Sequence, residues 1–458
     1  MDTFLLHRKN LARMLSDGPI LLAGNSPVLR NGDVHHPFRQ GSDFLYLSGV
    51  EEPDCWILID PTRKTHTLFI PKVDSLHRVW LGHVPSPAEA SAVYGFTKAF
   101  HADRLLRELR RARRGSRVLY SDKASLRRLS SLDPAASRGL TVRPAALRDA
   151  LDSLRAVKDP GEVSLLRRAS AVTSAAFRTA MKSVRPGMFE FELQAAFESA
   201  CLAGGLKRLA FESIVASGAN SAVLHYHGND QRIRPGSLVL LDAGAEYRGY
   251  AADITRTFPA GGRFTARQRD VYAIVLETQK AVIAAARPGV LSVDLHVLSM
   301  TMIAEGLKGL RLLKGSTSGL VEGGAVRLFY PHGIGHMLGL DVHDAGGGRG
   351  RRLPNPGKVP IRFVARLEPG FVLTVEPGVY FIPALLDETA NRRKFRGSVD
   401  FNRAEAWRGF GGVRIEDDVL VAKHGAPMNL TDVPKEIRDV EGLTASRRSS
   451  WAPSRSRA

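Results

Sequence analysis

The sequence predicts an α/β (α+β) protein built from two domains, and three observations lead to this prediction. At 458 residues the chain is long for a single domain. Its 44% hydrophobic and 24% charged residues are typical of a globular protein with a large core. Short apolar runs alternate with helical patterns through residues 1–155, whereas residues 156–441 contain a diverged duplication.

The first domain is expected to contain a sheet flanked by helices. Residues 55–59 and 67–70 are apolar runs rich in strand-forming residues, and Pro61 and Pro71 follow them where a strand would end. Strands that alternate with helical stretches are typical of an α/β domain.

A long helix is predicted to open the second domain. Asp159 is a suitable N-cap, Pro160 fits the first turn, and apolar residues then recur at helical spacing as far as Ala176. The tripeptide Arg-Pro-Gly at 185–187 should end this helix. We therefore place the domain boundary just before it, between residues 155 and 156.

The duplication within the second domain rests on two repeated segments. Residues 235–242, PGSLVLLD, recur as PGFVLTVE at 369–376, and each copy ends in a carboxylate, Asp242 or Glu376. The Arg-Pro-Gly tripeptide also recurs at 287–289, but at a different spacing, which implies an insertion in the second half. Two related halves are predicted, each with helices and a strand that ends in an acid.

The strand that ends at Asp242 is the first candidate for a charged site. An uninterrupted apolar run such as 238–241 predicts a strand buried on both faces, where an unpaired carboxylate would be costly. Asp253 follows in the pattern of a hairpin that returns to its start, which can bring the two acids together. The alternative is that Asp242 only begins a turn at Ala243-Gly244.

Two later segments add histidines and further charges. Residues 330–343 contain His332, His336 and His343 in a glycine-rich context, which argues against a helical zinc motif and favours a loop that approaches a site closely. Strand alternation places Arg414 and Glu416 on one face of a later strand. The alternatives are structural histidines and a surface ion pair.

Together, four carboxylates and one imidazole suit a hard or borderline divalent ion. Four acids are too many for one catalytic ion with an open position, and they suit two ions about 3.5–4 Å apart. The donor set favours Mn²⁺, and Co²⁺ or Zn²⁺ would also fit it.

These segments resemble the pita-bread metallopeptidases, and within them the Xaa-Pro group, which comprises prolidase and aminopeptidase P. The matching stretches are PFRQGSDFLYLSGVEEP (37–53), AVLHYH (222–227), LLDAGAEYRGYAADITRTFP (240–259), PHGIGHMLGLDVHDAGG (331–347), VLTVEPGVYF (372–381) and GFGGVRIEDD (409–418). The similarity covers most of residues 35–430 and is greatest to eukaryotic-type prolidase.

The resemblance implies a creatinase-like, aminopeptidase P-like domain over residues 1–155 and a pita-bread catalytic domain over residues 156–441. It leaves residues 442–458 as a basic tail, whose Ser and Arg content predicts disorder. It also implies a homodimer.

The resemblance further assigns roles to individual residues. Asp242, Asp253, His336, Glu376 and Glu416 match the family's metal ligands. His225 matches an active-site histidine, His332 and His343 match histidines that contact the substrate and the oxyanion, Arg414 matches an arginine that orders the site, and Glu376 is the expected proton shuttle. Phe211 departs from the family, which often has a tyrosine there.

The implied reaction is hydrolysis of the Xaa-Pro imide bond by a metal-bridging hydroxide, on small peptides with proline at the second position. Arg362 stands where eukaryotic-type prolidases place a carboxylate-binding arginine, which favours an Xaa-Pro dipeptidase. An aminopeptidase P that acts on longer peptides is the close alternative. A methionine aminopeptidase conflicts with the first domain, and a non-catalytic pita-bread binding module is the alternative from a different class.

Charge and cysteine content limit the partners and the compartment. The net charge of +19 could indicate nucleic acid binding, but the basic residues are spread along the chain apart from 104–117 and the tail, so a solvated basic surface is favoured. No signal peptide and no apolar run of about 18 residues is present, so no membrane partner is expected. Two cysteines suit a reducing, cytoplasmic location.

Overall fold

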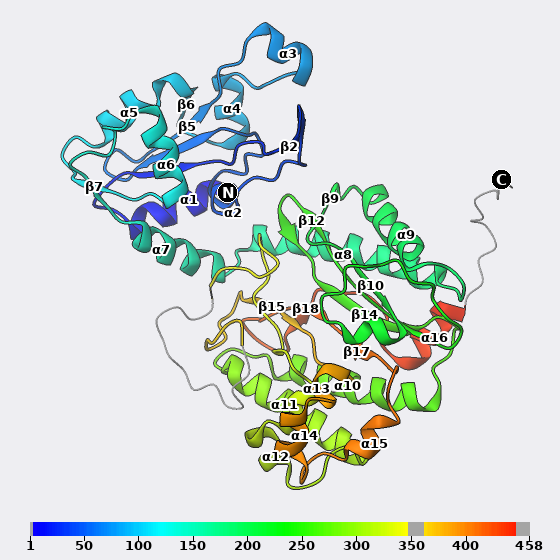
Figure 1. The fold of residues 1–458 in the computed structure, drawn as a ribbon. Helices are drawn as coiled ribbons and strands as arrows, with labels where there is room; N and C mark the ends of the chain where they lie inside the picture. Colours follow the sequence, from blue (N-terminus) through cyan, green and yellow to red (C-terminus); the bar gives the residue numbers. More distant parts are fainter. Residues whose placement is uncertain (1–2, 347–360, 446–458) are drawn as a thin grey trace, which may run out of the picture. The chain divides into compact units, whose positions relative to one another are not determined.

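The computed structural model describes residues 3–346 and 361–445, and the chain divides into two compact units, Met1–Gly161 and Glu162–Ala458 (Figure 1). The division comes later than the predicted boundary, because residue 155 lies inside helix α7 (Pro144–Ala156). Each unit has its own sheets and core.

The first unit is built around a four-stranded sheet in the order β1 (Ile20–Ala23), β4 (Trp56–Asp60), β5 (Thr65–Ile70) and β6 (Lys98–His101). Within this sheet the described pairs are antiparallel except β5 and β6, which pair in parallel. The two predicted strands are confirmed as β4 and β5. The other elements of this unit are α1 (Thr3–Met14), β2 (Leu29–Asn31), β3 (Val34–His35), α2 (Ser42–Ser48), α3 (Ser75–Leu81), α4 (Pro87–Tyr94), η1 (Ala102–Arg104), α5 (Leu105–Ala112), β7 (Val118–Leu119), α6 (Lys123–Leu132), β8 (Thr141–Val142) and α7.

The second unit begins with the predicted long helix, α8 (Pro160–Ser183), which has Pro160 at its first position and ends before Arg185. Its other helices are α9 (Glu190–Ala203), η2 (Gly218–Ala222), α10 (Ala266–Ala285), α11 (Ser292–Gly309), α12 (Thr317–Gly323), η3 (Ala325–Leu328), α13 (Pro383–Leu386), α14 (Thr389–Phe395), α15 (Phe401–Glu405) and α16 (Ile437–Ala445). Among the described residues, no helix is long and apolar enough to cross a membrane.

The strands of the second unit form several short antiparallel sheets. One sheet has the order β10 (Ile214–Ser217), β11 (Leu238–Ala243) and β14 (Ile254–Pro259), and a second has the order β15 (Val372–Val375), β18 (Asp417–Leu420) and β19 (Met428–Asn429). The remaining strands are β9 (Arg208–Leu209), β12 (Ala245–Tyr247), β13 (Tyr250–Ala251), β16 (Gly378–Tyr380) and β17 (Gly412–Arg414). The repeated segments of the sequence form β11 and β15, and all residues of both strands are buried.

Helices cover the strands and close the core of the second unit. Helix α9 contacts β10, whereas α10 contacts β15, β16 and β17, so the strands lie between helices in Figure 1. Fully buried aromatic side chains such as Phe177, Phe197 and Tyr272 fill the space between helices and strands. This packing makes the strands a rigid support for the residues at their ends.

The last helix corrects the prediction for the tail. Residues 442–445 were expected to belong to a disordered tail, but they form the last turn of α16. Val440 and Thr444 are buried, and the Glu441 carboxylate accepts hydrogen bonds from the Phe264 backbone N–H and from Arg269. These tertiary contacts, rather than local composition, hold the helix to Ala445. Residues 446–458 of the predicted tail lie outside the described residues.

Candidate active site

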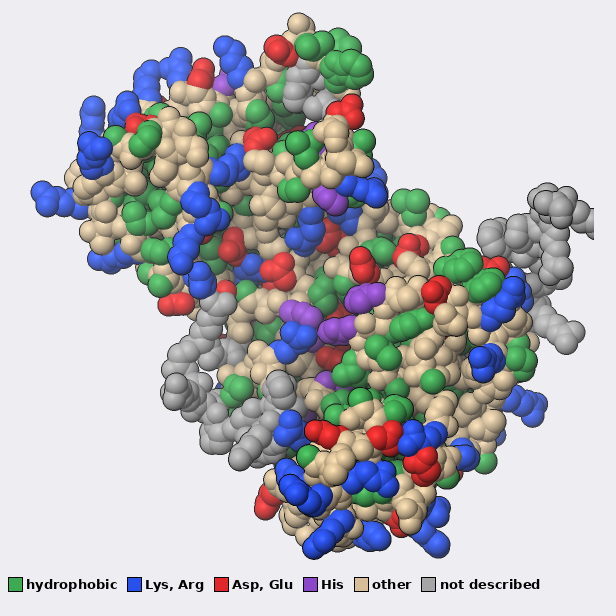
Figure 2. Space-filling model, in the orientation of Figure 1, with side chains coloured by type: hydrophobic (Ala, Val, Ile, Leu, Met, Phe, Trp, Pro, Cys, Tyr) green, Lys and Arg blue, Asp and Glu red, His purple; other side chains and the backbone are tan. Residues whose placement is uncertain are grey.

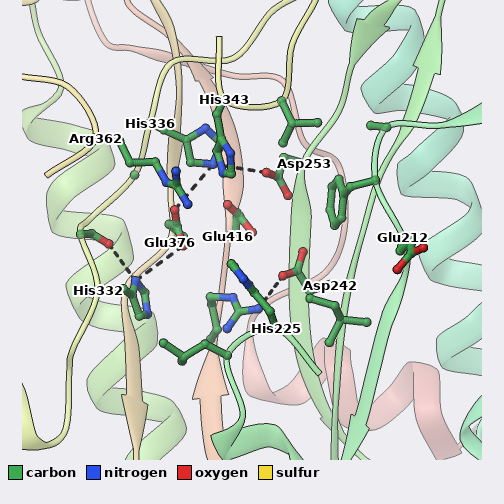
Figure 3. Close-up of a pocket in the computed structure, with 18 of the residues that line it drawn as sticks. Glu212, His225, Asp242, Asp253, His332, His336, His343, Arg362, Glu376 and Glu416 are labelled. Carbon is green, nitrogen blue, oxygen red and sulfur yellow. Dashed lines mark hydrogen bonds and ion pairs between the residues drawn. The ribbon is translucent and has the colours of Figure 1, made fainter. Parts of the chain in front are cut away.

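One pocket of about 1070 Å³ in the second unit brings together every residue that the sequence predicted for the site (Figure 3). Its lining includes His225, Asp242, Asp253, His332, His336, His343, Arg362, Glu376, Arg414 and Glu416. Figure 2 shows several histidine side chains gathered in one place on the surface of this unit.

Thr255 of β14 joins the two halves of the duplication between Asp242 and Glu416, which line the pocket. It pairs with Asp242 of β11 in the antiparallel register. On its other side, the Glu416 backbone N–H donates to the Thr255 carbonyl at 3.0 Å, and the Thr255 hydroxyl donates to Glu416 Oε2 at 2.7 Å. Asp242 and Glu416 are therefore fixed on neighbouring strands although they are far apart in sequence.

Backbone pairing also fixes His336 beside Glu376. The Thr374 N–H donates to the His336 carbonyl, and the Glu376 N–H donates to the Ile334 carbonyl, each at 2.9 Å. A side chain at Gly335 would collide with the Thr374 carbonyl, so this close approach requires glycine. The glycine-rich loop predicted from the sequence thus lies against the strand that ends at Glu376.

The His336 ring is oriented with one nitrogen toward the carboxylates. Its Nδ1 lies 3.1 Å from the Met337 carbonyl and carries the proton of the neutral ring, because a carbonyl can only accept. Its Nε2 lies 3.3 Å from Asp253 Oδ2 and 3.7 Å from Glu376 Oε1. Burial alone would lower the pKa of His336, but Asp253 and Glu376 together raise it.

The positive charges near the pocket carboxylates, among the described residues, do not offset the effect of burial on their pKa values. Burial raises the pKa of Asp242 to about 6 and that of Glu376 to about 7, although Arg414 opposes both shifts. Burial and the neighbouring Asp253 raise the pKa of Glu416 well above its usual range. A buried group of acids with these pKa values would be stabilised by a bound cation.

Two observations test whether these residues fit a metal. Ligand atoms of Asp253, His336 and Glu416 lie within 4.8 Å of one another, and all three residues are buried. Asp242 accepts a 2.5 Å hydrogen bond from Arg414 on Oδ2, whereas its buried Oδ1 has no hydrogen-bond partner among the described residues. Carboxylate oxygens and one imidazole are suitable donors for divalent ions, so the residues fit.

Tyr380 connects Arg414 to His332 and fixes the tautomer of that histidine. Arg414 Nη1 donates to the Tyr380 hydroxyl at 2.9 Å, and this hydroxyl lies 2.8 Å from His332 Nε2. The Gly333 carbonyl beside Nδ1 can only accept, so the neutral ring keeps its proton on Nδ1 and Nε2 accepts from the Tyr380 hydroxyl. Nδ1 lies 2.8 Å from the Gly333 carbonyl. Burial and Arg414 lower the pKa of His332 to about 3, so the ring is neutral near pH 7.

The outer part of the pocket contains the remaining predicted residues. His343 packs edge-on against His336, and burial, His336 and Arg362 lower its pKa to about 4. Burial and Arg414 also lower the pKa of His225. Arg362 is exposed and lines the pocket with them. Phe211 lines it too, without the hydroxyl that a tyrosine would offer.

Sequence reasoning missed Thr255, Tyr380, Arg256 and Asp418. Asp418 is buried and accepts hydrogen bonds from the Asp253 backbone N–H on both carboxylate oxygens at 3.3 Å. Two threonines and an arginine inside the buried strand 254–259 were a usable signal, because polar residues in a buried strand need partners. Tyr380 gave no comparable signal.

The fold and this buried carboxylate and histidine site define a metal-dependent hydrolase of the pita-bread type, and comparison with known proteins gives the family. The chain belongs to metallopeptidase family M24: residues 164–423 match that family, and residues 4–120 match the aminopeptidase P N-terminal domain. The chain is therefore a metallopeptidase, and the predicted fold class is confirmed.

Relatives with two different names cover nearly the whole chain. The human Xaa-Pro dipeptidase is 36% identical, over 98% of this chain and 94% of the relative. A probable Xaa-Pro aminopeptidase from Talaromyces marneffei is also 36% identical, over 93% and 92%. The structure of Pseudomonas aeruginosa aminopeptidase PepP superposes with a TM-score of 0.83 at 35% identity, over 96% of this chain and 97% of that one.

Proposed function

We propose that this metallopeptidase hydrolyses the Xaa-Pro bond of dipeptides. The observation that supports the choice of dipeptides is the place of Arg362 on the wall of the pocket that holds the buried carboxylates. An Xaa-Pro dipeptide has a free carboxylate directly after proline, and an arginine binds a carboxylate through two parallel hydrogen bonds. The human relative named Xaa-Pro dipeptidase agrees with this proposal.

The proposed metal ligands are Asp242, Asp253, His336, Glu376 and Glu416, with two divalent ions per subunit. Mn²⁺ is the proposed metal, and Co²⁺ or Zn²⁺ are alternatives that the same donors would accept. Ions held there would supply a nucleophilic hydroxide near neutral pH and polarise the peptide carbonyl. The support for this assignment is that Asp242 Oδ1 has no hydrogen-bond partner within residues 3–346 and 361–445, together with the raised pKa values of Asp242 and Glu376.

The side chains around the ligands have the following proposed tasks. Arg362 holds the substrate carboxylate. The neutral rings of His225 and His343 donate N–H groups to the oxygen that becomes negative in the transition state. Glu376 delivers a proton to the proline nitrogen, which needs one to leave.

Arg414 and His332 act as positioning groups in this proposal. Arg414 orients Asp242 through the 2.5 Å hydrogen bond and holds Tyr380, which fixes the His332 ring. His332 Nδ1 lies 3.6 Å from Glu376 Oε2 and so faces the proposed proton shuttle.

An aminopeptidase P activity on longer peptides is the second candidate, and the relatives named Xaa-Pro aminopeptidase favour it. Parallel assays of Gly-Pro and Gly-Pro-Ala separate the two activities. Cleavage of the dipeptide supports the proposal, whereas cleavage of the tripeptide alone would overturn the choice of dipeptidase. No metal in the protein and no cleavage of either peptide would leave a binding module.

Arg362→Ala tests the residue that supports the choice. It should raise KM for Gly-Pro by about 10-fold to 100-fold, because a charge-assisted bidentate contact of about 1.5–3 kcal/mol is lost. KM for Gly-Pro-Ala should change much less. Arg393→Ala, on the exposed face of α14, is the matched control. Equal losses for both peptides would assign Arg362 a structural role.

Glu416→Ala tests the proposed metal centre. The variant should lose a ligand and with it both bound metal and turnover, as measured by metal analysis and Gly-Pro hydrolysis. Near-normal turnover with two metals bound would show that the ligand assignment is wrong.

The proposal also includes a homodimer and a cytoplasmic location. Both described cysteines, Cys55 and Cys201, are free and buried, which suits a reducing compartment. Light scattering of the purified protein and fractionation of the cells that make it test these two points.

A further inference from the structure

The pocket has walls of opposite charge on the two sides of the buried carboxylates. In Figure 3, Arg362 lies next to Glu376 on one side of Glu416, and Glu212 lies on the other side, beyond Asp242 and Asp253. Both residues line the pocket, and the Glu212 side chain is 85% exposed. Glu212 is therefore accessible to a bound molecule.

The backbone around Glu212 is fixed to the strands of the site. The next residue, Ser213, accepts a 2.7 Å hydrogen bond on its carbonyl from the buried Asn229 side chain, whose Oδ1 accepts from the Val215 N–H at 2.9 Å. Ile214 then pairs with Asp242 in the antiparallel register. Glu212 thus belongs to a wall whose place relative to Asp242 is set by strand pairing.

The surroundings of Glu212 combine one negative charge with apolar surface. Its carboxylate lies 3.3 Å from His227 Nδ1, which is 60% exposed and cancels the charge only when protonated. Phe211, the neighbour of Glu212 in the chain, lines the same pocket, as do Val223 and Leu224. An apolar surface next to a carboxylate suits a long aliphatic side chain that ends in a cation, as in lysine and arginine.

This wall faces the residue before proline if the proposed function is right. With the substrate carboxylate at Arg362 and the scissile carbonyl at the buried carboxylates, the amino-terminal residue extends toward the opposite wall. We propose that Glu212 makes the enzyme select substrates with lysine or arginine before proline. This inference rests on the proposed function and adds a substrate class to it.

Apart from the proposed ligands, Asp341 is the other acidic residue among those described that line the pocket. Its backbone N–H donates to the Asp344 side chain, in the loop that leads to His343. Asp341 belongs to the wall that contains His343 and is the comparison residue for the test.

The experiment measures kcat/KM for Lys-Pro, norleucine-Pro and Glu-Pro with the manganese-loaded enzyme, at low and high salt. Lysine and norleucine have side chains of similar length, so their ratio isolates the charge. An exposed carboxylate and ammonium should favour Lys-Pro over norleucine-Pro by about fivefold, and high salt should reduce this preference. Glu-Pro should be the poorest of the three.

The variants decide between Glu212 and other sources of a preference. Glu212→Gln should bring the Lys-Pro to norleucine-Pro ratio close to one, and Glu212→Lys should favour Glu-Pro instead. Glu322→Gln, on the exposed surface of α12, should keep the wild-type ratio. A ratio that is unchanged in both Glu212 variants, or that changes in Asp341→Asn and not in Glu212→Gln, would overturn the inference.

The role of Glu212 and the proposed dipeptidase activity can be refuted separately. Hydrolysis of norleucine-Pro with no charge preference would refute the role of Glu212 and leave the proposed dipeptidase intact. No hydrolysis of any dipeptide by the metal-loaded wild type would refute the proposed function itself.

Discussion

Arg256 provides the sharpest test of how the core supports the site. The side chain is 1% exposed and uses all its donors. Its Nη1 donates to the carbonyls of Thr255 at 2.9 Å and Glu416 at 2.8 Å. Its Nη2 donates to Asp417 Oδ1 at 2.6 Å and to the Val433 carbonyl at 2.8 Å, and its Nε donates to the Pro434 carbonyl at 3.1 Å. One buried guanidinium therefore holds the backbone on both sides of the pairing between Thr255 and Glu416.

Arg256→Met removes this cation while keeping an apolar chain of similar length. Breaking a buried ion pair costs about 3–5 kcal/mol. Asp417 would still have Lys435 Nζ at 2.6 Å, so its charge would not be left alone. We therefore expect a loss of about 3 kcal/mol in the free energy of unfolding, to which the backbone carbonyls that lose a donor contribute.

Urea denaturation of the metal-free protein, followed by circular dichroism, measures this loss. If the two units unfold separately, only the transition of the second unit should move. Arg408→Met is the control, because the ion pair of Arg408 with Asp387 is about half exposed and should contribute little to stability. Because Glu416 would lose its backbone support, Mn²⁺ affinity should also fall by about 10-fold to 100-fold. Equal losses of stability in the two variants, or unchanged Mn²⁺ affinity in Arg256→Met, would refute the reasoning.

Three further predictions follow from other parts of the second unit. His296 is fully buried, and burial, with Arg327, lowers its pKa to about 4. Because the folded state resists protonation of this ring, the free energy of unfolding should fall by up to about 3 kcal/mol as the pH is lowered from 6.5 to 4. Urea titrations at each pH should show that His296→Leu removes this dependence. A pH-independent difference between the two proteins would contradict this. Glu190→Gln should lower the melting temperature and kcat. The buried Glu190 carboxylate accepts hydrogen bonds from the Ser217 and Gln231 N–H groups and from the Tyr226 hydroxyl, and Tyr226 is next to His225 in the chain. A variant with normal kcat would show that these hydrogen bonds do not position His225. Mn²⁺ loading at pH 6 should release more than one proton per protein, because the pKa values of Asp242 and Glu376 are raised to about 6 and about 7. Calorimetry in buffers of different ionisation enthalpy measures this release. No release at that pH would contradict the ligand assignment.

Much of the site was predictable because its residues lie at the ends of regular elements. Asp242 and Glu376 end apolar strands that the sequence repeats, and His336 belongs to a loop whose glycines permit a close approach. Such features are local, since they depend on alternation, chain ends and conformational freedom within a few residues. The same local information placed the start of the disordered tail too early, at residue 442, because the contacts that hold α16 come from Phe264 and Arg269.

The partners of the site residues were not predictable in this way. The pairing of Thr255 with Glu416 depends on the register between two halves of the fold, and one residue of slip would place different side chains in the pocket. The exposure of Glu212 and its contact with His227 likewise depend on how the segment before β10 leaves the sheet.

The sequence by itself determined the family, the two kinds of domain and the residue types able to bind a metal, because these are written in motifs of a few adjacent residues. Only the tertiary structure decided which nitrogen of His332 carries its proton, which oxygen of Asp242 lacks a partner and how far the pKa of Glu376 rises. Each of these depends on distances and burial among segments far apart in the chain, because electrostatic and hydrogen-bond energies change over a few ångströms.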